Sequence, residues 1–332
     1  QGESYEKNGV HILGFGAIAS NRLQRMLFTS RNAYRKALAA DANIYHLHDP
    51  ELLPYGLKLK RRGKTVIFDS HEDVPADILG KEWLPVFLRK GISRLYMWYE
   101  NRCFARMDAV IGVTPHICDR IRRQCARAEL ITNYPILEDC PPPSFTGRKI
   151  VFPGLVSPLW NIHTLLQALE TLPDVTLELR SRTVEEPYGS TLREMPAWKQ
   201  VNFPGKVSHA EVVELLSQCS CGVALAQPCA NSGWNLGTLG NTKLFEYMMA
   251  GIPVVCTNFI LWKELTDRWQ CGICVDPENT AEIASAIRYL LDHLEEARRM
   301  GQNGRKAVEK AYNWEVEEKK LLALYQELAK EG

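Results

Sequence analysis

The chain has 332 residues, of which 45% are hydrophobic and 24% are charged, and its formal net charge is +1. These values are typical of a soluble globular protein, and the length is sufficient for two domains. A net charge so close to zero argues against nucleic acid as a partner, and no apolar run is long enough to span a membrane. The 10 cysteines are scattered, and we expect no signal peptide, so the predicted location is the reducing cytoplasm.

The first half of the chain alternates apolar, strand-like segments with longer segments of helical pattern. After the polar residues 1–9, the expected strands are 10–15, 43–48, 65–69, 109–113 and 129–132. The expected helices are 22–40, 50–60, about 84–106 and about 116–124. Strands that alternate with helices favour a parallel sheet covered by helices on both faces.

The same alternation restarts after a proline-containing linker, which we place at residues 135–147. The expected strands of the second half are 149–154, 175–180, 201–205, 221–226, 254–256 and 272–275. The expected helices are 162–171, 210–218, 242–249, 280–293 and the amphipathic tail 314–330. We therefore predict an α/β fold in which two doubly wound, Rossmann-like domains face a cleft. The predicted domains are residues 1–134 and 148–313, and a final helix follows at residues 314–332.

The segment Gly233–Pro253 joins a glycine-rich loop to a short helix, which we expect at residues 242–249. The first amides of such a helix lack partners and attract an anion, and Lys243 adds a cation in the first turn. Glu246 shares a helix face with Lys243 and could accept hydrogen bonds from sugar hydroxyls. A simple ion pair between these two side chains in water remains an alternative, because one glycine-rich loop is weak evidence of a site.

Polar residues also follow the expected strands, at the sheet edge where this fold class binds its ligands. His48 and Asp49 follow one strand, and His71 and Glu72 follow the next strand along the chain. These histidines, and His46 within the first strand, have a second interpretation, in which each only donates a hydrogen bond to a neighbouring carbonyl. The sequence favours a ligand role for His71 more than for the other two.

Four stretches of the sequence together resemble glycosyltransferase family 4, whose members are retaining sugar-nucleotide transferases of the GT-B fold. The stretches are GNTKLFEYMMAGIPVV, HLHDPELLPYGLKLKRRGKTVIFDSHEDVP, FPGKVSH and YNWEVEEKKLLALYQEL, and the resemblance covers nearly the whole chain. It implies a C-terminal helix that crosses back to the first domain and a role in bacterial capsule, exopolysaccharide or lipopolysaccharide synthesis. The implied partners are a nucleotide sugar, with UDP the commonest choice in the family, and a glycan or lipid-linked acceptor.

The resemblance also assigns roles to residues by position. Glu246 falls where relatives hold the ribose hydroxyls, Lys243 approaches the diphosphate, and His71 stands beside the reacting sugar. We expect catalysis to depend on these three residues. The expected donor-binding residues are Gly154, Lys206, Val207, Thr238, Leu239, Gly240, Asn241, Lys243 and Glu246. The expected acceptor-side residues are His48, Asp49 and Glu72.

Three features depart from the family's pattern. Thr238 stands where relatives usually carry a glutamate, which leaves the side-chain contact with the transferred sugar open. Residues 158–161 read Pro-Leu-Trp-Asn where relatives often have a basic residue, so one diphosphate cation is missing or comes from elsewhere, with Lys206 as the candidate. Relatives open with a strand, a glycine-containing loop and a helix, and we expect that this unit is missing here and that the acceptor-side residues are incomplete.

The sequence contains no DxD motif, which sugar-nucleotide enzymes that use a metal often carry. We therefore predict no metal and no other cofactor, with the diphosphate stabilised by helix amides and Lys243. Cys271 and Cys274 have CxxC spacing, but no second ligand pair stands nearby, so structural zinc is disfavoured.

Several alternatives stay open at this point. A sugar-nucleotide epimerase or hydrolase of the same fold would bind the same donor, and a non-catalytic glycosyltransferase-like subunit would bind it without turnover. Segments 22–35 and 89–106 mix basic with apolar and aromatic residues, which suits peripheral docking on the anionic inner face of the cytoplasmic membrane. An ordinary surface helix with one face in the core explains that pattern equally well.

Overall fold

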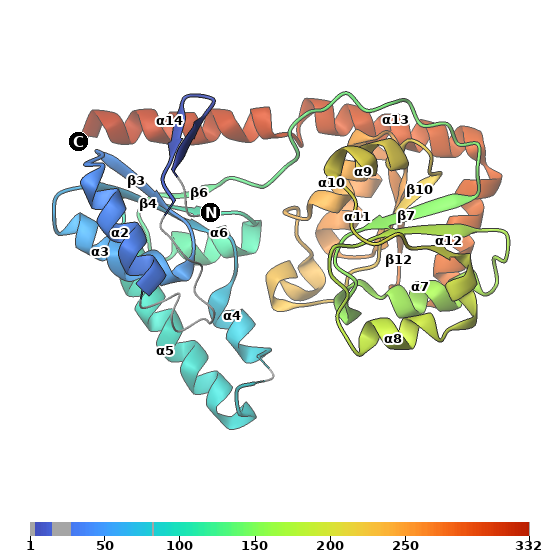
Figure 1. The fold of residues 1–332 in the computed structure, drawn as a ribbon, viewed down its shortest axis with the longest axis horizontal. Helices are drawn as coiled ribbons and strands as arrows, with labels where there is room; N and C mark the ends of the chain where they lie inside the picture. The colour runs from blue at the N-terminus through green and yellow to red at the C-terminus, as the bar shows by residue number, and fades with distance from the viewer. Residues whose placement is uncertain (1–3, 15–27, 82, 332) are drawn as a thin grey trace. The chain divides into compact units, whose positions relative to one another are not determined.

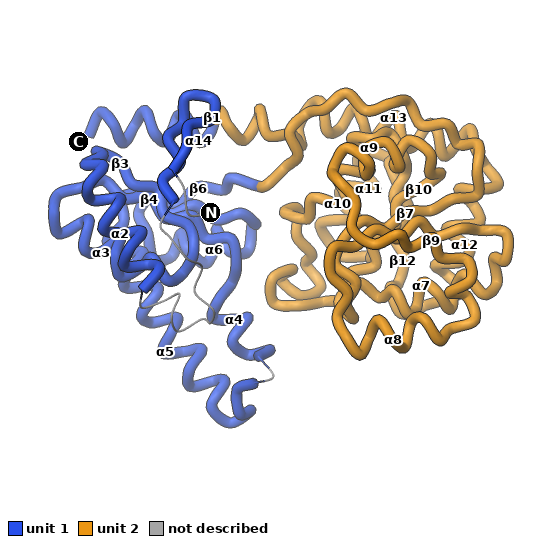
Figure 2. The backbone as a smooth tube through the Cα atoms, viewed as in Figure 1, with its two compact units in different colours: residues 1–132, 320–332 blue, residues 133–319 orange. Residues whose placement is uncertain are grey.

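In a computed structural model that describes residues 4–14, 28–81 and 83–331, the chain divides into two compact units (Figure 2). The first unit contains residues 1–132 and 320–332, and the second contains residues 133–319. The division falls close to the predicted domain boundary at residue 134, and the end of the predicted final helix groups with the first unit.

The first unit is built on a parallel sheet of four strands in the order β3–β4–β5–β6 (Figure 1). The strands are β3 (Ile44–Leu47), β4 (Thr65–Ser70), β5 (Ala109–Gly112) and β6 (Ala128–Leu130). All four residues of β5 are buried, as expected for a central parallel strand covered on both faces. Each strand lies within one of the segments predicted from the apolar pattern, except that β4 and β6 each begin or end one residue outside it.

Helices precede the first strand of this sheet and connect its successive strands. They are α2 (Ser30–Ala39), η2 (Pro50–Leu52), α3 (Leu53–Lys60), α4 (Val74–Leu79), α5 (Val86–Phe104) and α6 (Pro115–Arg122). The short α4 was not predicted, although Asp73 caps it by accepting a hydrogen bond from the Ala76 amide at 3.2 Å. Residues 22–27 of the predicted basic helix lie outside the described residues.

The prediction of a strand at 10–15 is only partly correct. The strand is β2 (Val10–Ile12), and it pairs antiparallel with an unpredicted β1 (Tyr5–Lys7) as a separate two-stranded sheet. A turn at Asn8 and Gly9, both with positive φ, joins the two strands. This local turn chemistry makes the segment a hairpin outside the parallel sheet.

The second unit contains a parallel sheet of six strands in the order β12–β11–β10–β7–β8–β9. The strands are β7 (Lys149–Pro153), β8 (Thr176–Arg180), β9 (Val201–Asn202), β10 (Cys221–Ala224), β11 (Val254–Thr257) and β12 (Gly272–Val275). The strand order reverses at β7, which has β8 on one side and β10 on the other. Ligands of open α/β sheets bind beside such a reversal, so the loops that follow β7 and β10 are the first places to examine.

The helices of the second unit include four that match predicted segments and three that do not. The predicted ones are α7 (Ile162–Leu169), α9 (His209–Leu216), α10 (Thr242–Met249) and α12 (Thr280–Asp292). The unpredicted ones are α8 (Tyr188–Arg193), α11 (Ile260–Trp269) and α13 (Leu294–Lys310). Gly304 weakens the helical signal of α13, but a Cβ there would lie 3.2 Å from Met248 Cγ, so glycine lets α13 pack closely on α10.

The C-terminal helix α14 (Trp314–Glu331) begins where Asn313 accepts a hydrogen bond from the Val316 amide at 3.1 Å. Two contacts attach its last turns to the first unit. Tyr325 Oη lies 2.6 Å from His46 Nδ1, and Glu331 forms a two-point ion pair with Arg127. None of the helices in the described part of the chain has the length and apolar character needed to cross a bilayer.

Candidate functional site

The loop before α10 is held in a fixed conformation by its own hydrogen bonds and by one buried tryptophan. Gly237 has a φ of 78°, a value that favours glycine, and the Gly240 amide donates to Thr238 Oγ1 at 2.9 Å. Trp262, which is fully buried, donates its Nε1 hydrogen to the Thr238 carbonyl at 2.7 Å. Asn241 caps α10 by accepting from the Lys243 amide at 3.1 Å. The loop is therefore supported from the core.

Lys243 points from the first turn of α10 into a small aromatic site. Its Nζ lies 4.0 Å from the centre of the Trp160 ring and 5.7 Å from that of Phe152. Burial lowers the pKa of this ammonium, while nearby Glu246 opposes the shift. Across the described residues, no hydrogen bond or ion pair satisfies Nζ. A partly buried cation without an anionic partner is suited to binding an anion.

The loop that follows β7 reaches the same place. Gly154 has a φ of 154°, and a Cβ built on it would lie 2.9 Å from Lys243 Nζ, so only glycine leaves room for the lysine. Farther along this loop, Ser157 Oγ and Asn161 Nδ2 are buried and have no hydrogen-bond partner among the described residues. Gln227, which follows β10, donates to Asn161 Oδ1 at 2.7 Å. The structure thus joins the two loops at the strand-order reversal.

Other predicted donor-site residues form no described hydrogen bond or ion pair with the Lys243 ammonium. These residues are Glu246, Lys206, Leu239 and Val207. Glu246 is half-buried on α10, and it raises the pKa of Lys243 without forming an ion pair with it among the described residues. Lys206 is exposed between β9 and α9, and it has no hydrogen bond or ion pair within the described ranges. Leu239 packs against the hydrophobic core, and Val207 is half-buried. Trp160, from segment 158–161, contacts the Lys243 ammonium, although the sequence did not assign it to the site.

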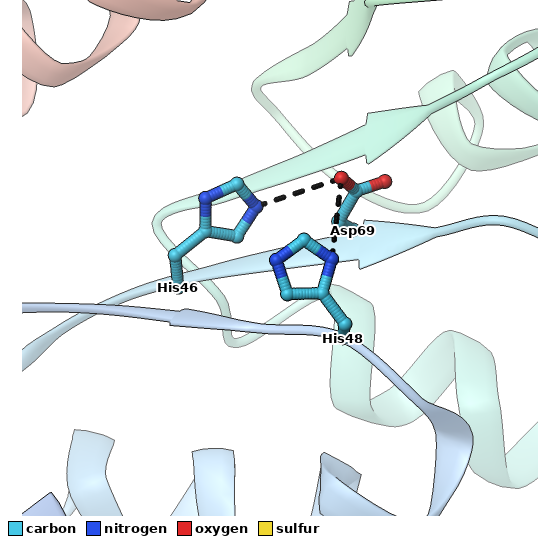
Figure 3. A group of neighbouring side chains, drawn as sticks. All are labelled: His46, His48 and Asp69. Carbon is cyan, nitrogen blue, oxygen red and sulfur yellow. Dashed lines mark ion pairs between the residues drawn. The ribbon is translucent and has the colours of Figure 1, made fainter. Parts of the chain in front are cut away.

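Three histidines of the first unit lie around one carboxylate, and Figure 3 shows two of them, His46 and His48, with Asp69. Asp69 Oδ2 lies 3.7 Å from His46 Nε2, 3.5 Å from His48 Nδ1 and 3.5 Å from His71 Nε2. His48 Nδ1 and His71 Nε2 are 3.0 Å apart. His46 and His48 are two residues apart along β3 and its end, so they face the same side, and Asp69 faces them from β4.

Burial controls the protonation of this cluster. It lowers the pKa of His46 to about 4, with the neighbouring imidazoles adding to the shift, and it also lowers the pKa of His71. Burial raises the pKa of Asp69, while His48 acts in the opposite direction. His46 is therefore a neutral imidazole near pH 7, and its free nitrogen can act as a ligand or acceptor.

Sequence reasoning named His48 and His71 but missed Asp69. The available signal was a charged residue at the end of an otherwise apolar strand, TVIFDS, opposite two histidines spaced by two. Asp49 and Glu72 are exposed, and Asp49 has a φ of 71°. Both raise the pKa of His71 electrostatically, but neither forms a described hydrogen bond to it through its side chain.

One group among the described residues has the composition and spacing to hold a metal ion. His46, His48 and Asp69 each offer one ligand atom, and these atoms lie within 4.8 Å of one another. The CxxC pair does not form a second such group in the described part of the chain. Cys274 Sγ lies 3.8 Å from Cys256 Sγ instead, inside the core of the second unit.

Comparisons with known proteins cover both units. The family model for glycosyl transferases group 1 matches residues 145–307, and the model for glycosyltransferase family 4 matches residues 1–133. The chain is also similar to an MMP alpha-(1->4)-mannosyltransferase from Mycolicibacterium hassiacum, with 27% identity over 185 residues. That match covers 54% of this chain and 43% of the mannosyltransferase, so it spans less than half of that relative.

Solved structures resemble the whole chain. A sucrose-phosphate synthase from Thermosynechococcus elongatus has a TM-score of 0.78 and 18% identity, with 99% of this chain and 86% of that chain covered. The HepE protein of Anabaena, solved with UDP and glucose, has a TM-score of 0.72 and 15% identity, with 96% and 87% covered. Identities this low establish the fold alone. They confirm the predicted α/β fold of GT-B type, with two Rossmann-like domains.

Proposed function

Because the chain belongs to glycosyltransferase family 4, we propose that it transfers a sugar from a nucleoside diphosphate to a hydroxyl group of an acceptor. The observation that carries this proposal is the partly buried, unpaired Lys243 ammonium beside Gly154 and the first amides of α10. A diphosphate would supply the negative charge that this arrangement lacks. UDP is the proposed nucleotide, and HepE, which shares the fold, was solved with UDP.

The proposed chemistry follows from where charge develops. As the bond between the sugar and the diphosphate breaks, the diphosphate gains negative charge, and prepositioned donors stabilise it without reorganising. The Lys243 ammonium and the positive end of the α10 dipole would act in this way without a metal ion at the diphosphate. Glu246 is proposed to accept hydrogen bonds from the ribose hydroxyls. His71 keeps the role that the resemblance assigns to it, contact with the transferred sugar.

The first experiment is a thermal-shift screen of UDP, GDP and their common sugar derivatives. A ligand at a hundred times its Kd stabilises the folded state by about 2.7 kcal/mol, which gives a clear shift. In the Lys243→Ala variant we expect nucleotide affinity to fall, and turnover to fall by about a hundredfold, because removal of one such donor raises the barrier by about 3 kcal/mol. Lys263→Ala is the matched control, since Lys263 is an exposed lysine paired with Asp267 on α11. Wild-type affinity and turnover in Lys243→Ala would contradict the proposal.

Product analysis separates transfer from the other activities of this fold. Donor incubated alone gives free epimer or free sugar if the protein is an epimerase or hydrolase, whereas a transferase also needs an acceptor. Nucleotide binding without any turnover, restored only by a second protein, would instead indicate a non-catalytic subunit. The stacking of Trp160 on Lys243 is the feature that makes this last outcome worth testing.

We propose that the acceptor is a glycan or lipid-linked intermediate of bacterial surface polysaccharide synthesis, reached from the cytoplasmic side of the membrane. The supporting feature is α5 and the turn before it, where large apolar side chains are exposed together. They are Trp83, Val86, Phe87, Leu88, Leu95 and Trp98. A groove of about 550 Å³ at the C-terminal half of α5 shares Trp98 with this set and is lined by basic and aromatic residues, including Lys60, Arg61, Arg102 and Arg106. Apolar side chains flanked by cations suit an anionic lipid surface.

Flotation with liposomes tests this docking. We expect binding to vesicles that contain anionic lipid at low salt, loss of binding at high salt, and weaker binding for Phe87→Ser, since Phe87 is 82% exposed. Ile260→Ser is the matched control because Ile260 is an exposed apolar residue of the second unit. Absence of wild-type binding at low salt would rule the docking out.

A further inference from the structure

The histidine cluster of the first unit has the spacing of a metal-binding site. Asp69 Oδ2 lies 3.5 Å from His48 Nδ1, 3.5 Å from His71 Nε2 and 3.7 Å from His46 Nε2, and the His48 and His71 nitrogens are 3.0 Å apart. In a tetrahedral zinc site with bonds of about 2.0–2.1 Å, neighbouring ligand atoms are about 3.3 Å apart. In Figure 3 both imidazole rings turn a nitrogen toward the same oxygen of Asp69, and the three ligand atoms lie within 4.8 Å of one another.

The hydrogen-bond inventory supports an additional ligand at this point. His46 Nε2 and Asp69 Oδ1 are both buried, and within the described residues neither has a hydrogen-bond partner. The 3.7 Å separation of His46 Nε2 from Asp69 Oδ2 is too long for a hydrogen bond. A buried polar atom left without a partner costs about 1–3 kcal/mol. A cation bound by the His46 ring nitrogen would remove the deficit of that atom.

The orientation of His46 is also the one that a metal ligand requires. Its Nδ1 lies 2.6 Å from Tyr325 Oη, on the part of α14 that belongs to the first unit. When Nδ1 carries the proton and donates it to the tyrosine oxygen, the lone pair of Nε2 points into the cluster. Metal-bound histidines are commonly held in this way by a second hydrogen bond on the far ring nitrogen.

We propose that His46, His48 and Asp69 bind a divalent transition-metal ion of the zinc class. Two imidazoles and one carboxylate favour such an ion over magnesium or calcium, which prefer an all-oxygen shell. The His71 ring nitrogen, 3.0 Å from His48 Nδ1, is the nearest further donor for the fourth position, which water occupies otherwise. The proposed ligands all belong to the first unit, whereas the diphosphate site proposed on α10 is made of residues of the second unit. The existence of the metal site does not depend on the sugar-transfer proposal.

The test is metal binding by the full chain, with no activity measurement. After dialysis against a chelator, Zn²⁺ is titrated by calorimetry, and Co²⁺ is added separately to record the visible absorption of nitrogen-bound cobalt. We expect one equivalent of either ion per chain. His48→Gln should abolish stoichiometric binding, and because His48 is an exposed side chain the variant should stay folded, as circular dichroism would verify.

Two further variants distinguish a built site from surface binding. His209→Gln is the matched control, since His209 is an exposed histidine paired with Glu138, and it should bind like the wild type. Tyr325→Phe should weaken binding by about 10- to 100-fold, as loss of such a supporting hydrogen bond typically does. The proposal is overturned if the wild type binds neither ion at micromolar concentration, or if His48→Gln binds as tightly as the wild type.

Discussion

Replacement of Gly154 by alanine is a sharp test of the donor site, because it displaces the Lys243 ammonium without removing it. A Cβ at residue 154 would lie 2.9 Å from Nζ and closer still to Cε, whereas ordinary van der Waals contact begins near 3.4 Å. The clash is with the flexible end of a lysine, so the lysine moves and the sheet does not. The main effect should therefore be on binding rather than on folding.

The size of the effect can be estimated from the interaction that is lost. A hydrogen bond to a charged group contributes about 1.5–3 kcal/mol, and each 1.4 kcal/mol changes a dissociation constant about tenfold. We expect the Kd of Gly154→Ala for UDP to rise by about 10- to 100-fold. The positive φ of residue 154 adds backbone strain of about 1–2 kcal/mol, which lowers the melting temperature but leaves the protein folded.

Calorimetric titration with UDP, and with GDP in parallel, measures the affinity, and urea denaturation measures the stability. Gly63→Ala is the control: residue 63 also has a positive φ, 72°, but no atom lies within 4 Å of the added Cβ. It should lose a similar amount of stability and keep wild-type affinity. If Gly154→Ala binds both nucleotides as well as Gly63→Ala does, Lys243 does not contact the diphosphate.

Three further predictions concern other contacts. Because burial lowers the pKa of Lys243 below the usual 10.5 of a lysine, nucleotide affinity should decline at alkaline pH with a midpoint below 10.5. Lys243→Arg should lack this decline in titrations at several pH values. Arg120→Met should destabilise the fold by about 3–5 kcal/mol at pH 8, since Glu100 is 2% exposed and would lose its partner. Since burial raises the pKa of Glu100, protonation should shrink this deficit at pH 5, and an equal deficit at both pH values would contradict the reasoning. Trp262→Phe should lower the free energy of unfolding by about 1–3 kcal/mol in urea denaturation, and it should weaken nucleotide binding, because the Thr238 carbonyl loses its donor. Unchanged affinity would show that this loop does not support nucleotide binding.

Much of the fold could be predicted from the sequence because its signals are local. The helix at 242–249 was predicted with the bounds that α10 has, since a capping residue, good helix formers and a following Gly-Ile-Pro all lie within one segment. The parallel strands were recognisable as short apolar runs. The helices α8, α11 and α13 were not predicted; α8 has only six residues, and α13 carries Gly301 and Gly304 in its interior, which lower its helix propensity.

The two candidate sites were also only partly predictable from the sequence. The sequence by itself determined the chemistry available at each strand end, namely the glycines and lysine of the α10 loop and the histidines that follow β3 and β4. Only the tertiary structure decided which of these groups meet. It stacked Trp160 on Lys243 from another loop, and it brought Asp69 and Tyr325 to His46 from positions 23 and 279 residues away along the chain. Contacts between residues so far apart depend on strand order and register, which no short segment encodes.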